Sequence, residues 1–169
     1  MTGNGTATIT DGNALAGCSK VSSCLADVGD SITITPTASS GNRLASWSGG
    51  TCSGVSNPCS FSASKTETDT ANFAKTVTIT AATTGSGTAT ISDSDAIAGC
   101  SNVTSCLADV GDQITITASA SSGNRFTGWS GGTCSGTSTT CTVTVSKAET
   151  DTATFKQTFT VSTAVSGSG

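Results

Sequence analysis

Apolar and polar residues alternate along much of the chain. In S-I-T-I-T-P-T-A (31–38) and Q-I-T-I-T-A-S-A (113–120), every second residue is apolar and the residues between are mostly Thr or Ser. This period of two places the apolar side chains on one face of a strand, and Thr, Val and Ile favour strands. The same alternation predicts half-buried antiparallel strands at 6–10, 76–81, 141–146 and 158–162.

Turn-forming residues separate these segments, as in D-G-N (11–13), V-G-D (28–30) and G-S-G (85–87). The best helix candidate is A-L-A-G-C (14–18) with its copy A-I-A-G-C (96–100), at most one turn long. In the second half of the chain we expect short strands at 87–91, 104–109, 113–120, 125–130, 141–146 and 150–155. The pattern predicts an all-β fold.

The chain repeats itself with a period of 82 residues, the difference between Cys100 and Cys18. The same shift relates all four cysteines of each half and the two tryptophans, without a gap. The ends match as well, since 157–169 aligns with 75–87. We therefore divide the chain into module 1 (1–74), module 2 (75–156) and a segment (157–169) that is the first strand of a further repeat or a donor or linker strand.

Each module is small, and its apolar content is low, with 34% hydrophobic and 4% aromatic residues. A core of this kind is only marginally sufficient, and eight cysteines in two sets of four would compensate as disulfides formed in an oxidising compartment. Zinc is disfavoured because the spacings are C-x5-C and C-x6-C and His is absent. Four cysteines allow three pairings. We favour the local ones: Cys18–Cys24, Cys52–Cys59, Cys100–Cys106 and Cys134–Cys141.

Large side chains recur at matching positions and are expected to anchor the two cores. A carbohydrate-binding platform would need several exposed aromatic residues, but the chain has no Tyr and one Trp per module. The expected core anchors are Leu44, Trp47 and Phe73 in module 1 and Phe126, Trp129 and Phe155 in module 2.

Charged residues make up only 11% of the chain, and the net charge is −4. Scattered Lys and Arg argue against a nucleic-acid footprint. No apolar stretch approaches the roughly 20 residues of a membrane helix, so no membrane insertion is expected. No signal-peptide pattern follows Met1, so we expect either that Met1 begins a mature region or that export information lies outside this segment.

Candidate chemistry is sparse, and we expect no enzyme and no cofactor. Without His there is no Ser-His-Asp or Cys-His arrangement. The pairs Asp27–Asp30 and Asp109–Asp112 lie in D-V-G-D turns, where Asp is ordinary. Calcium is the more serious hypothesis, although no EF-hand loop is present. Its candidate ligands are Asp11, Asn13, Asp93 and Asp95. We expect the charges of Lys65, Glu67, Lys147 and Glu149 to face solvent in turns.

The stretch G-D-Q-I-T-I-T-A-S-A-S-S-G-N-R-F-T-G-W-S-G-G-T-C-S-G-T-S-T-T-C-T-V-T-V (111–145), followed by D-T-A-T-F (151–155), resembles the divergent internalin-B B-repeat type of bacterial repeat domain. Module 1 departs from the pattern at Leu44, Ser46 and Asn72. The resemblance implies sandwich-like or grasp-like β modules, strung in tandem in secreted or surface proteins as spacers or adhesive stalks. It implies neither catalysis nor a cofactor.

The sequence therefore favours one of two functions. The first is a structural module of an extracellular or bacterial cell-surface adhesin-like protein. Its partners are neighbouring repeats, or identical protomers joined head to tail if 158–165 pairs with another chain. The alternative is a module that binds a glycan, a host protein or another surface ligand through the loops 51–59 and 133–141. These loops are built mainly of Ser, Thr and Gly, which weakens the alternative.

Overall fold

The computed structural model describes residues 3–12, 18–93 and 100–167, and within these ranges the regular elements are all strands. The one-turn helix candidates at 14–18 and 96–100 lie almost wholly outside the described residues. In the described part of the chain, no helix has the length and apolarity needed to cross a membrane. The chain divides into two compact units, Met1–Val77 and Thr78–Gly169.

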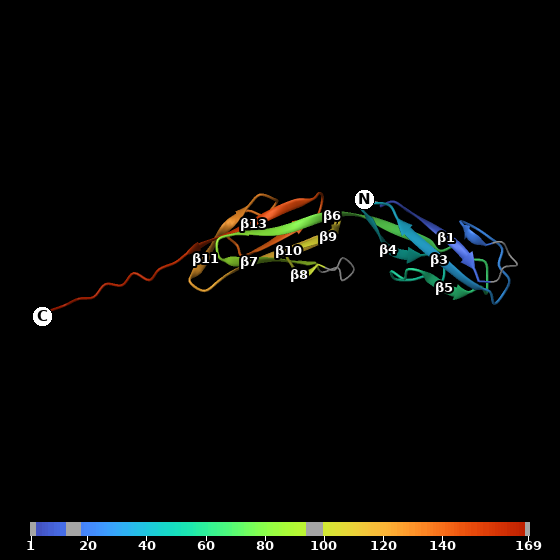
Figure 1. The fold of residues 1–169 in the computed structure, drawn as a ribbon, viewed down its shortest axis with the longest axis horizontal. Coiled ribbons are helices and arrows are strands. Elements are labelled where there is room, and N and C mark those ends of the chain that lie inside the picture. Colours follow the sequence, from blue (N-terminus) through green and yellow to red (C-terminus); the bar gives the residue numbers. More distant parts are fainter. Residues whose placement is uncertain (1–2, 13–17, 94–99, 168–169) are drawn as a thin grey trace. The chain divides into compact units, whose positions relative to one another are not determined.

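Unit 1 contains two sheets (Figure 1). The first has the order β2-β1-β3-β5 and is antiparallel. In the second, β4 pairs antiparallel with the first part of the long strand β6. The strands are β1 (Gly5–Asp11), β2 (Ser19–Val21), β3 (Ser31–Ala38), β4 (Asn42–Ser48), β5 (Cys59–Ser62) and β6 (Thr70–Thr84).

Unit 2 repeats this plan with two additional pairings. One sheet has the order β12-β10-β7-β8. In the other, β11 pairs with β13, β13 pairs with the second part of β6, and β6 also pairs with β9. The strands are β7 (Gly87–Asp93), β8 (Ser101–Val103), β9 (Ser105–Asp109), β10 (Gln113–Ala120), β11 (Asn124–Ser130), β12 (Thr140–Thr144) and β13 (Glu149–Gln157).

The core of each unit lies between its two sheets. In unit 1, Ile32 and Ile34 of β3 pack in one cluster with Trp47 of β4, from the other sheet. In unit 2, Ile114 and Ile116 of β10 are fully buried, while Thr115 between them and Thr117 after them are more exposed. The alternation read from the sequence therefore places apolar side chains between two facing sheets, as in a sandwich. The prediction of an all-β fold of two tandem modules is confirmed.

Two disulfides staple each unit, as expected for cores of this size. The bonded pairs are Cys18–Cys24, Cys52–Cys59, Cys100–Cys106 and Cys134–Cys141. The expected anchors lie at or near the cores. Trp47, Trp129 and Phe155 are buried, whereas Leu44, Phe73 and Phe126 are partly exposed. In unit 2, Phe126 makes ring contacts with Trp129 and Phe155.

Two expectations about strands need correction. The pairing of β13 with β6 is parallel rather than antiparallel, because β6 reaches this sheet from unit 1 and not through a hairpin. The segment 158–162, predicted as a strand, has no strand structure. Its alternating sequence fits a strand, but a strand also needs a neighbour to pair with, and none of the described strands supplies one.

Candidate functional sites

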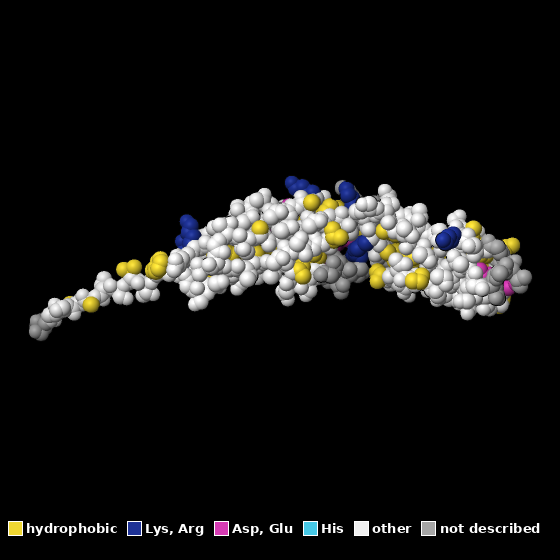
Figure 2. All heavy atoms as spheres, in the orientation of Figure 1, with side chains coloured by type: hydrophobic (Ala, Val, Ile, Leu, Met, Phe, Trp, Pro, Cys, Tyr) yellow, Lys and Arg dark blue, Asp and Glu magenta, His cyan; other side chains and the backbone are white. Residues whose placement is uncertain are grey.

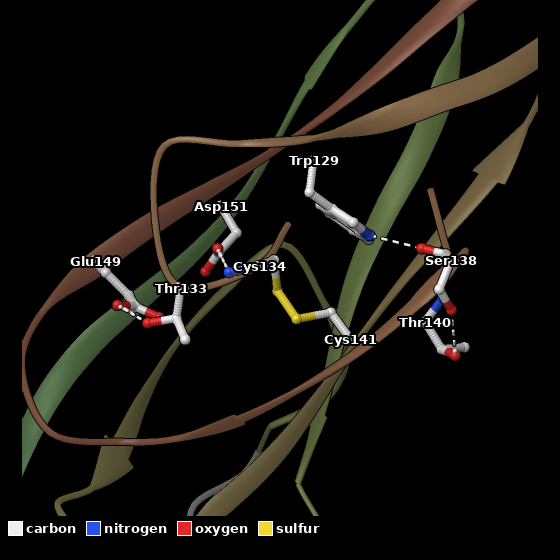
Figure 3. The surroundings of a disulfide bond; sticks show 8 residues. All are labelled: Trp129, Thr133, Cys134, Ser138, Thr140, Cys141, Glu149 and Asp151. Atoms are coloured by element: carbon white, nitrogen blue, oxygen red, sulfur yellow. Dashed lines mark hydrogen bonds between the residues drawn. A yellow bond between two sulfur atoms is a disulfide. The ribbon is translucent and has the colours of Figure 1, made fainter. Parts of the chain in front are cut away.

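The loop closed by Cys134 and Cys141 is held by the core tryptophan beneath it (Figure 3). The indole Nε1–H of Trp129 donates a 2.8 Å hydrogen bond to the carbonyl of Ser138. In unit 1, Trp47 makes the same 2.8 Å bond to Ser56. Each tryptophan therefore buries its ring and uses its single donor to fix the backbone of the loop. This is a structural role.

Two carboxylates lie on the other side of the same loop (Figure 3). Asp151 Oδ1 accepts a 2.7 Å bond from the backbone N–H of Cys134, and Glu149 Oε2 accepts a 2.8 Å bond from the hydroxyl of Thr133. Asp151 is fully buried. Its Oδ2 and the Oε1 of Glu149 are buried and accept no hydrogen bond. A Cβ at Gly132 would lie 2.5 Å from Asp151 Oδ1, so the loop closes directly over the carboxylate.

The surroundings of Asp151 change its acidity. Burial raises the pKa of Asp151 above its ordinary value, the N–H of Cys134 lowers this pKa in part, and the neighbouring Glu149 raises it further. Below the raised pKa the carboxyl of Asp151 is neutral. Protonation of Asp151 therefore favours the folded state of unit 2.

The two carboxylates that bond to the disulfide loop form what we call the loop brace, and unit 1 has the same loop brace. The expectation that Glu67 and Glu149 face solvent was therefore wrong. Asp69 Oδ1 accepts a 2.7 Å bond from Cys52 N, and Glu67 Oε2 accepts a 2.9 Å bond from the hydroxyl of Thr51. The side chain of Glu67 is only 12% exposed, whereas that of Lys65, 3.9 Å away, is 69% exposed. Sequence reasoning missed this role. The signal was the acidic E-T-D triplet at the same place in both repeats.

The D-V-G-D carboxylates close turns. Asp30 Oδ2 accepts a 2.9 Å bond from the N–H of Asp27, and Asp112 Oδ2 accepts a 3.1 Å bond from the N–H of Asp109. The backbone N–H of the fourth residue returns to the carbonyl of the first in both copies. These contacts are those of an Asp that caps a turn.

The structure describes only half of the calcium candidates. Asp11 and Asp93 end β1 and β7, and their backbone N–H groups bond to the carbonyls of Cys18 and Cys100. Asn13 and Asp95 lie outside the described residues. Among the described residues, no three acidic, Cys or His side chains gather as a metal site. Calcium binding stays a prediction.

The second part of β6 is an integral part of the core of unit 2. Ile79 is fully buried and Ala81 is 4% exposed. The N–H of Ala81 bonds to the carbonyl of Thr104 at 2.8 Å, and the hydroxyl of Ser105 bonds to the carbonyl of Ile79 at 3.2 Å. With β13 on one side and β9 on the other, the strand that leaves unit 1 completes unit 2.

The surface carries few charges. In the view of Figure 2, Lys and Arg are scattered, and small polar side chains and backbone cover most of the surface. Tandem repetition, paired sheets and two disulfides per unit define the class: a disulfide-stapled all-β repeat protein.

The chain belongs to the divergent InlB B-repeat domain family, whose model matches residues 2–77 and 75–159. The resemblance read from the sequence is thereby confirmed. The two matches overlap at 75–77, inside β6, where the two units meet along the chain. Neither a curated protein nor a solved structure shows significant similarity to this chain.

Proposed function

We propose that this chain is a structural repeat of a bacterial extracellular or cell-surface, adhesin-like protein. It acts as a stalk, spacer or filament-building unit, and copies join head to tail by strand donation. Its partners are neighbouring repeats or identical protomers. The proposal assigns the chain no catalytic activity and no cofactor.

The observation that carries this proposal is the shared strand. Residues Thr70–Lys75 of β6 pair with β4 in unit 1, and Ile79–Thr84 pair with β13 in unit 2. No Gly or Pro interrupts the strand between them. Each added repeat can therefore begin with a strand that continues the repeat before it, which is how an array without linkers is built.

The disulfides support the proposed extracellular location. All cysteines of the described residues are in disulfides, which persist in oxidising compartments outside the cytosol. The family is one of bacterial repeat domains. An extracellular stalk made of small modules needs such staples, because each core is small.

Binding through the disulfide loops is the alternative function. The residues between the cysteines, 53–58 and 135–140, are exposed in both units. However, they carry no aromatic and no charged side chain, and each tryptophan beneath them uses its N–H within the loop. A glycan array probed with the whole chain tests this alternative, and specific hits lost on changing residues 135–140 would favour it.

The stalk function is tested by the way length grows with the number of modules. We expect the maximum dimension from small-angle X-ray scattering to rise in proportion to the number of 82-residue repeats fused in frame. A matched series with a short Gly/Ser insertion after Val77 of each repeat interrupts the shared strand, and its dimension should rise more slowly. If the two series scale alike, the shared strand does not set the spacing and the stalk function fails.

A further inference from the structure

In unit 1, the edge of β6 that faces away from β4 borders an open trough. Among the described residues, no strand pairs with this edge, and the N–H of Gly3 bonds to the carbonyl of Phe73 at its end. Two hollows of about 520 and 680 Å³ meet at Ala7 and Asp69. Together they follow residues 66–73, along the edge that faces away from β4. Core side chains such as Ile32 line the trough. A trough lined by both apolar and polar side chains, beside a strand edge, is a site for a further strand.

In unit 2, the place equivalent to the trough is occupied by the second part of β6. Ile91 and Ala108 are fully buried there, beneath the second part of β6. Their counterparts one period earlier are Ile9, which is partly exposed, and Ala26, which is exposed. The surrounding sequences are almost identical, since C-L-A-D-V-G-D recurs without change. The difference in burial therefore comes from the strand that unit 2 has and unit 1 lacks among the described residues.

The backbone beside the trough has less strand structure in unit 1 than in unit 2. In unit 2, β13 begins at Glu149, but its equivalent in unit 1 begins only at Thr70, three residues later than the counterpart Glu67. In unit 2, β9 lies on the other side of β6, whereas its counterpart 23–27 is not a strand. Residues 67–69 and 23–27 would both lie beside a strand at this place. They are not strands in unit 1, because among the described residues no such strand is present for them to pair with.

The chain also carries an unpaired strand of the right kind. Beyond Thr158, which bonds to Gly123, residues 159–167 are exposed and have no strand structure. Phe159, Val161 and Val165 are 78%, 91% and 96% exposed, and Figure 2 shows apolar side chains along this C-terminal segment. Such alternating apolar side chains in solvent are unfavourable, and pairing would bury them.

We propose that residues 158–164 of one copy insert into the trough of unit 1 of a second copy. The inserted strand runs parallel to residues 67–70, in the register that β6 adopts against β13. In this register Val161 takes the place that Ile79 occupies in unit 2. The inference gives the head-to-tail assembly of the proposed function its donor segment and its acceptor site, and it rests on that function.

The acceptor has the polar groups that the inserted strand needs. Applying the register of unit 2, the N–H of Thr163 donates to the carbonyl of Ser22, and the hydroxyl of Ser23 donates to the carbonyl of Val161. Both serines line the trough. The donor segment T-F-T-V-S-T-A (158–164) contains no charge, Gly or Pro, so no residue in it opposes strand formation.

Donor and acceptor are different surfaces of one chain, so the contact is heterologous. A copy whose trough is filled still has a free donor, and a copy whose donor is used still has a free trough. Unless the rotation between copies closes a ring, the product is an open polymer with a direction.

The test is sedimentation velocity of the full chain over a wide range of concentrations, beside two variants. The first ends at Gln157 and keeps only the acceptor. The second carries K-T-V-T-I-T-A-A-T, the sequence of 75–83, in place of Met1, so that the trough is filled within the chain and only the donor remains. We expect the full chain to grow in steps of 16.4 kDa, each variant alone to stay monomeric, and their mixture to stop at a one-to-one dimer.

Two point substitutions distinguish insertion at this site from non-specific hydrophobic association. Val161→Asp places a charge at the position of fully buried Ile79 and should weaken association by more than about 100-fold. Thr160→Asp places the same charge at the position of exposed Thr78 and should leave association nearly unchanged. The tryptophan fluorescence of both variants should match that of the parent, since the donor lies outside both cores.

The inference is overturned if the full chain stays monomeric at every concentration, if the chain ending at Gln157 still polymerises, or if the two variants do not dimerise when mixed. A monomer whose trough is filled by its own tail gives the first of these results. None of them affects how length grows with fused repeats, so this inference and the stalk function fail separately.

Discussion

The two copies of the module permit one substitution to be made twice in nearly the same surroundings. Ile91 and Ile9 occupy equivalent positions on β7 and β1, but Ile91 is fully buried and Ile9 is partly exposed at the trough. We therefore predict that Ile91→Ala costs clearly more stability than Ile9→Ala. The chain ending at Gln157 is the background, because its trough stays empty.

The magnitudes follow from burial. Ile→Ala removes three carbons, and at about 0.8 kcal/mol per buried CH₂ the transfer loss at Ile91 is about 2.4 kcal/mol. The closed core of unit 2 adds a cavity, bringing the expected cost to about 3–4 kcal/mol. At Ile9 part of the side chain is already in water and the space left is open to solvent, so we expect about 1–1.5 kcal/mol.

Guanidinium unfolding followed by tryptophan fluorescence measures each cost in its own unit. Each unit has one buried tryptophan, so Trp129→Phe leaves Trp47 to report on unit 1, and Trp47→Phe leaves Trp129 to report on unit 2. Adding excess peptide of sequence 158–167 should raise the cost of Ile9→Ala toward that of Ile91→Ala. Equal costs without peptide would refute the reasoning, because the core of unit 1 would then be closed in solution.

Three further predictions concern the loop brace in unit 2. Replacing Cys134 and Cys141 by Ser should lower its unfolding free energy by about 2.5 kcal/mol on the loop-entropy model, measured by denaturant titration; no loss would show that the hydrogen bonds alone fix the loop. Gly132→Ala should destabilise unit 2 and lower its melting temperature, because the new Cβ would meet the carboxylate of Asp151. Because the pKa of Asp151 is raised in the folded state, its contribution to stability is full below about pH 3.9 and is lost as the pH rises through the raised value. Asp151→Asn should remove this decline from unfolding curves measured across that range, with Asp69→Asn as the matched control; an unchanged pH profile would contradict the assignment.

The sequence was sufficient for the elements whose partners lie nearby in the repeat. Alternation predicted 31–38 and 113–120, and β3 and β10 have these bounds. The period of 82 residues and the cysteine count predicted two stapled modules. These features are local or repeated, so the physical signal is present in each short window of the chain.

Pairing across modules could not be predicted in the same way. The segments 76–81 and 158–162 have the same alternating pattern, yet the first is a buried strand and the second is an exposed tail. Strand propensity does not say whether a neighbour is present, and that neighbour decides the outcome here. The brace by Glu149 and Asp151 was missed for a related reason. Acidic residues near a turn usually face solvent, and only the fold shows the loop closing over them.

The parallel pairing of β6 with β13 has a mechanical consequence for a chain under tension. The chain enters unit 2 through the second part of β6 and leaves the paired region through β13, and the paired residues run from Ile79 with Glu149 to Thr84 with Thr154. Because the strands are parallel, pulling on these two points slides one strand along the other. The hydrogen bonds between them then share the load and must break together, whereas a hairpin pulled from its open end would lose its hydrogen bonds singly, in sequence. Unit 2 would thus resist a force applied between the second part of β6 and the end of β13.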